Sequence, residues 1–198
     1  MKKKGLMIAL ALIMALGVGA GATLAYLFVQ TEPVVNTFEY GDINITLDES
    51  DADGDKNTKK NDYKMVPGNK IAKDPRVVVE TGSEDCYLFI KIEKSSNYST
   101  YLEDYKLADG WNSLGGVEGV YYREAAAGDS FYVLANGGDE YANGYVEVKT
   151  TVTKSDMAAI KESGMPTLTF TAYAVQKANI GTAADAWAIA QNNGLPTN

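Results

Sequence analysis

The sequence predicts a mainly β fold, an antiparallel β-sandwich of jelly-roll type with two short peripheral helices. Several segments alternate apolar and polar residues with period two, which is the pattern of a half-buried strand. The 198 residues include 13 tyrosines and 19 glycines, a composition that favours strands and turns over helices. Turn-rich loops separate the alternating segments, and this arrangement favours two packed antiparallel sheets over a parallel α/β sheet.

The strands are expected in order along the chain, beginning with one that changes its inward face. Phe38 and Tyr40 share one parity, whereas Ile43 and Ile45 share the other. We therefore expect a bulge or bend at residues 41–42. Further strands are expected at 71–80, 86–94, 119–124, 130–134, 145–153 and 167–176, with 63–66 as a short extra strand.

The two longest of these strands are each expected to have one buried face and one solvent-exposed face. Such one-sided burial is typical of antiparallel sheets. The expected buried faces are Val146, Val148, Thr150 and Val152 in the first strand, and Leu168, Phe170, Ala172 and Ala174 in the second.

Two helices are expected at the periphery of the sheets. Ser155 can cap a helix from Asp156 to Glu162, which Gly164 and Pro166 would end.

The second helix opens with Thr182 and Asp185, which resemble a capping box. Its apolar stripe indicates that Trp187 anchors the helix on a sheet rather than binding a ligand. The stripe consists of Ala183, Ala186, Trp187 and Ala190.

The N-terminus has the three parts of a secretory signal. Residues 2–4 are lysines, an uncharged apolar stretch covers residues 5–29, and small residues stand at Thr23 and Ala25. We therefore expect a signal peptide that is cleaved between Ala25 and Tyr26. The alternative is that the stretch remains uncut as a membrane anchor, because about 20 apolar residues are enough to span a bilayer.

Cleavage would remove residues 1–25 and leave residues 26–198 as one secreted domain. The signal peptide holds three of the 18 basic residues and none of the 26 acidic residues, so 15 basic residues remain and the net charge becomes −11. This charge argues against nucleic acid or anionic lipid as a partner, because both are bound through Lys and Arg. Membrane contact is expected only through an uncleaved signal peptide.

Cys86 is the only cysteine, so no disulfide within the chain can stabilise the fold. It shares a strand face with Leu88, Ile90 and Ile92. We therefore expect a buried, unreactive thiol rather than an active one.

An acidic loop follows the first strand and carries the only candidate metal ligands. Asp51, Asp53 and Asp55 alternate as the first ligands of a calcium loop do. The EF-hand pattern then fails, because Gly54 stands at the fourth position instead of the sixth and Asp62 replaces the glutamate at the twelfth. A solvated acidic loop and a weak Ca²⁺ site are the two interpretations, and no other cofactor is expected.

The chain contains no histidine. A Ser-His-Asp triad, a Cys-His pair and a His-ligated catalytic zinc are therefore excluded. A glycosidase with two carboxylates needs no histidine, but a sequence cannot show the separation of such a pair.

Several pieces of the sequence carry a family resemblance. They are Gly21-Ala22-Thr23-Leu24-Ala25-Tyr26 at the end of the signal peptide, Asn36-Thr37-Phe38 with Gly41-Asp42-Ile43, residues 65–69 and 73–75, and Thr167 to Gln176. Together these pieces resemble the TasA/camelysin family, secreted proteins of Gram-positive bacteria whose leaders are processed by a SipW-type signal peptidase. The resemblance implies a jelly-roll fold and covers most of the chain.

The family resemblance implies two functions of different classes. TasA-like members are subunits of extracellular biofilm matrix fibres, whereas camelysin-like members carry a metallopeptidase label. Because the chain lacks histidine and a His-Glu-x-x-His helix, we expect a fibre subunit and no enzyme. The alternatives are a camelysin-like cell-surface metallopeptidase and a soluble surface binding module.

In TasA-like fibres the mature N-terminal segment of one subunit adds as a strand to the next subunit. The matching residues here are 26–36, in which Leu27, Val29 and Val35 would supply the apolar side chains. The alternative is that this segment is a flexible linker once cleavage has freed it. The expected partners are thus further copies of the chain and the peptidase, and the expected location is the extracellular matrix or the cell surface.

Overall fold

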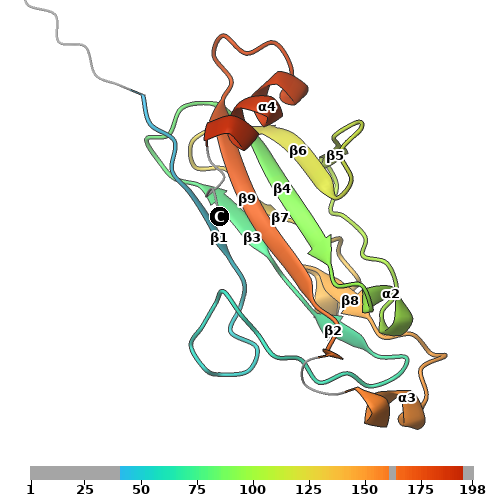
Figure 1. Cartoon of the computed structure of the whole chain (residues 1–198). Helices are drawn as coiled ribbons and strands as arrows, with labels where there is room; N and C mark the ends of the chain where they lie inside the picture. Colours follow the sequence, from blue (N-terminus) through green and yellow to red (C-terminus); the bar gives the residue numbers. More distant parts are fainter. Residues whose placement is uncertain (1–40, 161–163, 194–198) are drawn as a thin grey trace, which may run out of the picture. The chain divides into compact units, whose positions relative to one another are not determined.

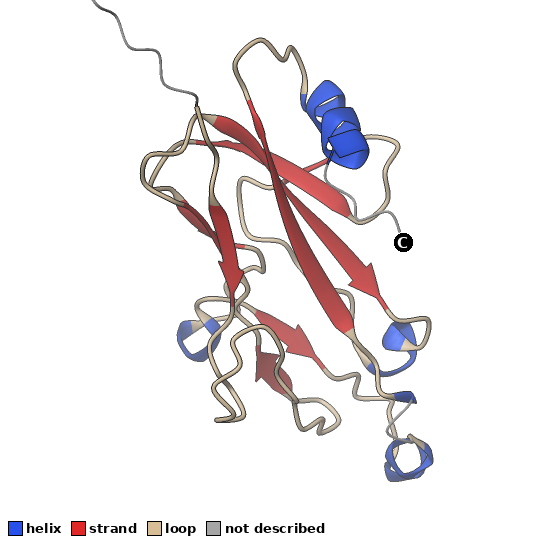
Figure 2. Ribbon diagram, turned by 60° about the vertical axis from the view of Figure 1, so that its left-hand side comes forward, coloured by secondary structure: helices blue, strands red, loops and turns tan. Residues whose placement is uncertain are grey.

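The computed structural model describes residues 41–160 and 164–193. The expected signal peptide, the expected cleavage residues Ala25 and Tyr26, and the expected strand at Phe38 and Tyr40 therefore lie outside the described residues. Within those residues the fold is mainly β, with antiparallel sheets and three short α-helices (Figures 1 and 2). This confirms the predicted class.

The strands form three antiparallel sheets that remain separate from one another. The first sheet has the order β1-β3-β7, the second pairs β2 with β8, and the third has the order β5-β6-β4-β9. Their bounds are β1 Ile45–Asp48, β2 Lys70–Ala72, β3 Arg76–Val79, β4 Cys86–Lys94, β5 Asn112–Ser113, β6 Val120–Ala125, β7 Ser130–Tyr132, β8 Tyr145–Glu147 and β9 Leu168–Gln176.

The longest pairing joins β4 to β9 over nine residues, from Cys86 opposite Gln176 to Lys94 opposite Leu168. On its other side β4 pairs with β6. Figure 1 shows β4 and β9 side by side along the sheet. The central strand β4 is therefore the one around which the sheet is built.

The main hydrophobic core lies between side chains of the first and third sheets. Val77 and Val79 of β3 are fully buried and cluster with the inward residues of β4. Those residues are Cys86, Leu88, Ile90 and Ile92, which confirms their predicted common face. Burial, assisted by Asp85 and Asp129, raises the pKa of the Cys86 thiol from its ordinary value of 9.0 to about 11.

The opposite face of β4 is covered by the helix α4, Ala183–Asn193. The Trp187 ring lies 5.2 Å from the rings of both Phe89 and Tyr173 and is 6% exposed. At the start of α4, Thr182 Oγ1 donates to Asp185 Oδ2 at 2.6 Å and accepts from the Asp185 N–H at 3.1 Å. The capping pair and the packing role of Trp187 are confirmed.

The single strand expected over residues 71–80 is wrong. The segment forms two strands, β2 and β3, which pair with different sheets. Pro75 is buried between them and cannot donate to a ladder, because proline has no backbone N–H. The short extra strand expected over residues 63–66 is also absent from the described structure.

The strand expected over residues 145–153 is shorter than predicted, since β8 ends at Glu147. Val146, Val148 and Val152 are nevertheless buried as expected, whereas Thr150 is exposed in a turn. Beyond the end of β8, Val148 forms backbone hydrogen bonds with Gly68 and Asn69, which precede β2, and an isolated bridge with Leu102.

The helix α3, Lys154–Ala159, begins two residues earlier than the predicted Asp156 and ends at Ala159 instead of Glu162. Its N-cap is Thr153 rather than Ser155, because Thr153 and Asp156 form a reciprocal capping box. Two further elements have no counterpart in the predictions. They are the helix α2, Tyr98–Tyr101, and a 3₁₀ turn, Asp139–Tyr141.

Candidate functional site

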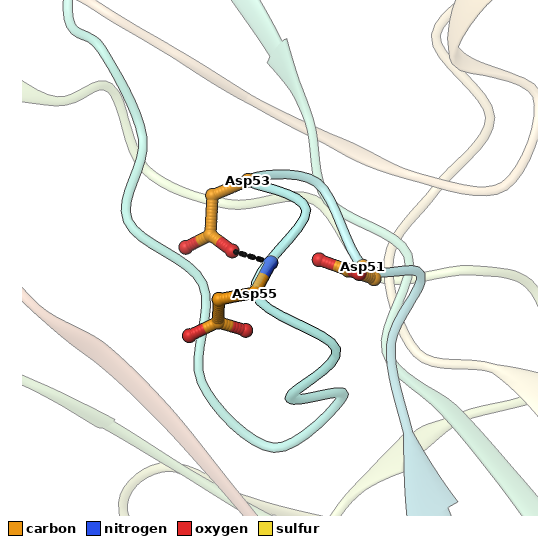
Figure 3. Close-up of side chains that lie close together, drawn as sticks. All are labelled: Asp51, Asp53 and Asp55. Carbon is orange, nitrogen blue, oxygen red and sulfur yellow. Dashed lines mark hydrogen bonds between the residues drawn. The ribbon is translucent and has the colours of Figure 1, made fainter.

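The acidic loop connects β1 to β2 and brings its three aspartates together. One carboxylate oxygen from each of Asp51, Asp53 and Asp55 lies within 4.8 Å of the others. Figure 3 shows the three side chains gathered around one turn of the loop, where all of them are exposed. Calcium is bound by oxygen ligands at about 2.3–2.6 Å, so small movements of these side chains would suffice to place them around one ion.

The three carboxylates already accept hydrogen bonds from the loop backbone. Asp51 accepts from the N–H groups of Gly54 at 2.7 Å and Lys56 at 3.0 Å. Asp53 accepts from Asp62 at 2.8 Å and from Asp55 at 3.2 Å, and these bonds hold the pKa of Asp53 below its ordinary value. The loop is therefore ordered by its own backbone and leaves only part of each carboxylate for a cation.

A groove of about 800 Å³ lies between this loop and the beginning of β9. We call it the β9 groove. Its walls combine apolar side chains, from β1, the loop, β2 and β9 among other segments, with a similar share of polar and charged ones. The apolar residues include Leu47, Met65, Ile71, Leu102, Leu168 and Phe170.

The least exposed ion pair of the β9 groove joins Lys73 to Glu49. Lys73 Nζ lies 2.8 and 3.0 Å from the two carboxylate oxygens of Glu49. The Lys73 and Glu49 side chains are only 11% and 13% exposed. Asn61 Nδ2 and the Tyr63 hydroxyl each donate to Glu49 Oε2 at 3.3 Å. A buried charge is costly unless it is paired and hydrogen-bonded, and here Glu49 has three partners.

Tyr63 packs against the same ion pair. Its ring lies 5.2 Å from Lys73 Nζ, and the Phe170 ring of β9 lies at the same distance. Burial raises the pKa of the Tyr63 hydroxyl, and the neighbouring Glu49 carboxylate raises it further. Tyr63 therefore stays protonated and acts as a hydrogen-bond donor.

The edge of the third sheet is the other feature with a functional meaning. Among the described residues, β9 pairs with β4 on one side and has no hydrogen-bonded strand on the other, although β1 lies close to it. A sheet edge presents unpaired N–H and C=O groups on which another strand can add. The expected donor residues Leu27, Val29 and Val35 lie outside the described residues.

Sequence reasoning found Asp51, Asp53 and Asp55 but missed Glu49, Asn61 and Lys73. The alternation of aspartates is a local pattern, which can be read from neighbouring residues. Glu49 and Lys73 come together only because the loop folds back to the connection between β2 and β3. Ser50 marks this return, since its N–H and hydroxyl both donate to Asp74, at 3.0 and 2.6 Å. No spacing in the sequence signals such a contact.

No protein-family model matches the chain, and no curated protein matches it. In the described part of the chain, no helix combines the length and the apolar character needed to cross a bilayer. Function is therefore inferred from the residues and their arrangement.

Proposed function

We propose that the chain is a secreted structural subunit of extracellular matrix fibres, in which a strand of one subunit adds to a sheet of the next. The observation that carries this proposal is the unpaired side of β9. Secretion and processing by a SipW-type signal peptidase belong to the same proposal, because the donor segment becomes free only after cleavage between Ala25 and Tyr26.

The strand β9 lacks the features that usually protect a sheet edge. Natural edge strands are kept short or carry lysine, proline or a bulge, because an open edge invites pairing with another chain. In contrast, β9 is nine residues long and contains no charged residue, no proline and no glycine. It pairs without interruption along its whole length with β4. Its geometry therefore suits the addition of a strand.

The β9 groove supports specific recognition beside this edge. Strand addition takes its affinity from backbone hydrogen bonds and its specificity from pockets for alternate side chains. Leu168 and Phe170 belong to β9 and also line the groove. We propose that residues 26–36 of the neighbouring subunit pair with β9 and place apolar side chains in the groove. Leu27, Val29 and Val35 share one parity and would supply them.

We also propose that the two larger sheets form a jelly-roll sandwich. Residues of β3 and β4, which belong to different sheets, share one core cluster with Val133 and Ala125. Aligned packing of two sheets across such a core is typical of sandwiches. An experimental structure with a different connection of the sheets would replace this part of the proposal.

We propose no enzymatic activity for the chain. Its 198 residues include no histidine, which the usual zinc peptidase needs both to bind its metal and to form the His-Glu-x-x-His helix.

The fibre proposal is tested with the processed chain that begins at Tyr26. Deletion of residues 26–35 is expected to leave a folded monomer and to abolish filaments in negative-stain electron microscopy. Thr171→Lys, in the middle of β9, is expected to weaken filament formation strongly, because lysine on an edge strand opposes the addition of another strand. Thr151→Lys adds the same charge to an exposed turn and serves as the matched control, which should form filaments normally.

Circular dichroism and sedimentation separate loss of assembly from loss of folding. Filaments of unchanged appearance from the truncated chain would exclude strand addition by residues 26–36. A processed chain that stays monomeric at every concentration would instead favour a soluble surface binding module.

We further propose that Ca²⁺ binds the acidic loop only weakly. The loop lacks a closing bidentate glutamate, and its carboxylates already accept backbone N–H groups. Calorimetry is expected to give a Kd of about 10⁻⁴ to 10⁻³ M, as in extracellular modules, and Asp53→Ala should remove the binding. Micromolar affinity would contradict this expectation.

A further inference from the structure

The ion pair in the β9 groove has an asparagine amide as its third member. Lys73 Nζ and Asn61 Nδ2 both donate to the same oxygen, Glu49 Oε2, at 3.0 and 3.3 Å. The amine and the amide are therefore only two hydrogen bonds apart. A carboxyl group placed between an amine and an amide can move protons between them.

The amine of Lys73 is mostly buried. The Lys73 side chain is 11% exposed and lies over the rings of Tyr63 and Phe170, each at 5.2 Å. Its backbone is fixed as well, since the Lys73 N–H donates to Gly144 O at 3.1 Å. The hydrogen bond from Lys73 Nζ to Glu49 is the path along which the amine can give up a proton. The amine without that proton is the nucleophilic form of lysine.

The amide of Asn61 is held by both of its polar atoms. Its Oδ1 accepts from the Ala52 N–H at 2.7 Å, and its Nδ2 also donates to Ser50 O at 3.1 Å. A backbone N–H in this position polarises the carbonyl and would stabilise negative charge that develops on its oxygen.

We propose that Lys73 and Asn61 become joined by an intramolecular isopeptide bond, with Glu49 as the acid–base group. The Lys73 amine, after giving its proton to Glu49, attacks Asn61 Cγ. The Nζ–Cγ bond forms, the Cγ–Nδ2 bond breaks, and Glu49 passes protons from the attacking nitrogen to the leaving nitrogen. The amide nitrogen departs as ammonium, Glu49 ends as a carboxylate, and no oxidant, metal or further reactant is needed.

This bond would give the acidic loop a covalent anchor on the connection between β2 and β3. It would close residues 61–73 into a ring, which restricts the unfolded chain as a disulfide does. The lone Cys86 cannot provide such a restraint within the chain. The inference stands independently of fibre formation, because the three residues belong to one subunit.

Peptide mapping of the purified full chain tests the bond directly. Trypsin cleaves after Lys60, Lys64, Lys70 and Arg76, and a modified Lys73 resists cleavage. The expected product is a branched peptide that joins residues 61–64 to residues 71–76 and is lighter than their combined mass by one ammonia. Separate peptides 61–64 and 71–73 at their sequence masses would overturn the proposal. Loss of ammonia confined to peptide 61–64 would overturn it too, because it marks a cyclised asparagine.

The peptide map of the wild-type chain decides whether the isopeptide bond exists. Three variants then test the roles of Lys73, Asn61 and Glu49 in forming it. Lys73→Arg keeps the charge and removes the amine, Asn61→Ala removes the amide, and Glu49→Gln keeps the shape but cannot exchange protons. All three are expected to lose the branched peptide. Lys59→Arg changes a lysine of the exposed Asp48 pair and should retain it. A branched peptide that persists in Glu49→Gln would remove Glu49 from the reaction.

Discussion

The strands β4 and β9 are both nine residues long and pair with each other throughout, yet they are buried very differently. Five consecutive residues of β4 are buried, from Cys86 to Ile90, whereas Val175 is the only buried residue of β9. β4 has a strand on each side and a packed layer on each face. β9 has one partner strand among the described residues. The two strands therefore differ in burial as they differ in position, β4 being central in its sheet and β9 at its edge.

The largest expected effect comes from opening a cavity beneath α4. Phe89→Ala in β4 should lower the free energy of unfolding by about 3–5 kcal/mol, because a fully buried ring is lost. Its partner across the ladder, Tyr173 of β9, packs against the same Trp187. Tyr173→Ala should lower the free energy of unfolding by only about 1–2 kcal/mol, because the Tyr173 ring is partly exposed. Urea denaturation measures both. Equal losses would show that β9 contributes to the core as much as β4 does.

A backbone change at Gly119, which precedes β6 and contacts β4, should have the next largest effect. Gly119 has a φ of 72°, and an added Cβ would lie 2.6 Å from Ile92 O. Gly119→Ala should therefore lower the free energy of unfolding by about 2–3 kcal/mol. Alanine disfavours the left-handed backbone, and its Cβ would strain the hydrogen bond that Ile92 N–H donates to Gly119 O. Gly115→Ala meets nothing within 4 Å and should change stability by less than about 0.5 kcal/mol. Thermal denaturation that ranks the two variants alike would contradict the close approach.

The smallest effect concerns thiol chemistry. Cys86 in native protein should resist alkylation at pH 8, since it is fully buried and its pKa is raised to about 11. A cysteine in β9, placed by Thr169→Cys in a Cys86→Ala chain, should react quickly because position 169 is exposed. Mass spectrometry of labelled protein distinguishes the two, and rapid labelling of native Cys86 would show that β4 opens readily.

The raised pKa of the Cys86 thiol also makes the free energy of unfolding depend on pH, and it determines the sign of that dependence. The folded state holds the thiol proton more tightly than the unfolded state does. Its contribution to stability is therefore complete below pH 9 and is lost as the pH rises toward 11. Cys86→Ala should lose less stability than the wild type over this window, as measured by urea denaturation at each pH.

Alternation along the chain predicts which residues face the core but not which strand they pair with. It placed Cys86, Leu88 and Ile90 on one buried face correctly, because parity is a local property of a strand. It failed over residues 71–80 because the parity continues across Pro75 while the chain passes from one sheet to another. Pairing depends on partners far away in the sequence, and only the missing N–H of Pro75 gave a local sign of the break.

The helix caps and the candidate site also divide into features that neighbouring residues predict and contacts that form only in the folded chain. Thr153 and Ser155 are both good capping residues, and the choice between them depends on which one reaches Asp156 in the folded loop. The cap of α4 had a single candidate and was predicted correctly. Likewise the aspartate cluster was visible in the sequence, whereas the contact of Glu49 with Lys73 requires the loop to be folded first.

The central place of β4 also has a consequence for the order in which the molecule folds. Its two partner strands come after it, β6 beyond α2 and β5, and β9 near the end of the described residues. Contacts between residues so far apart in the sequence form slowly, because closing a long loop costs conformational entropy before any stabilising contact is made. The sheet and the α4 layer on it therefore cannot be completed until β9 and α4 have been synthesised. For a chain exported as we propose, this delay keeps it unfolded and able to pass through a translocation channel.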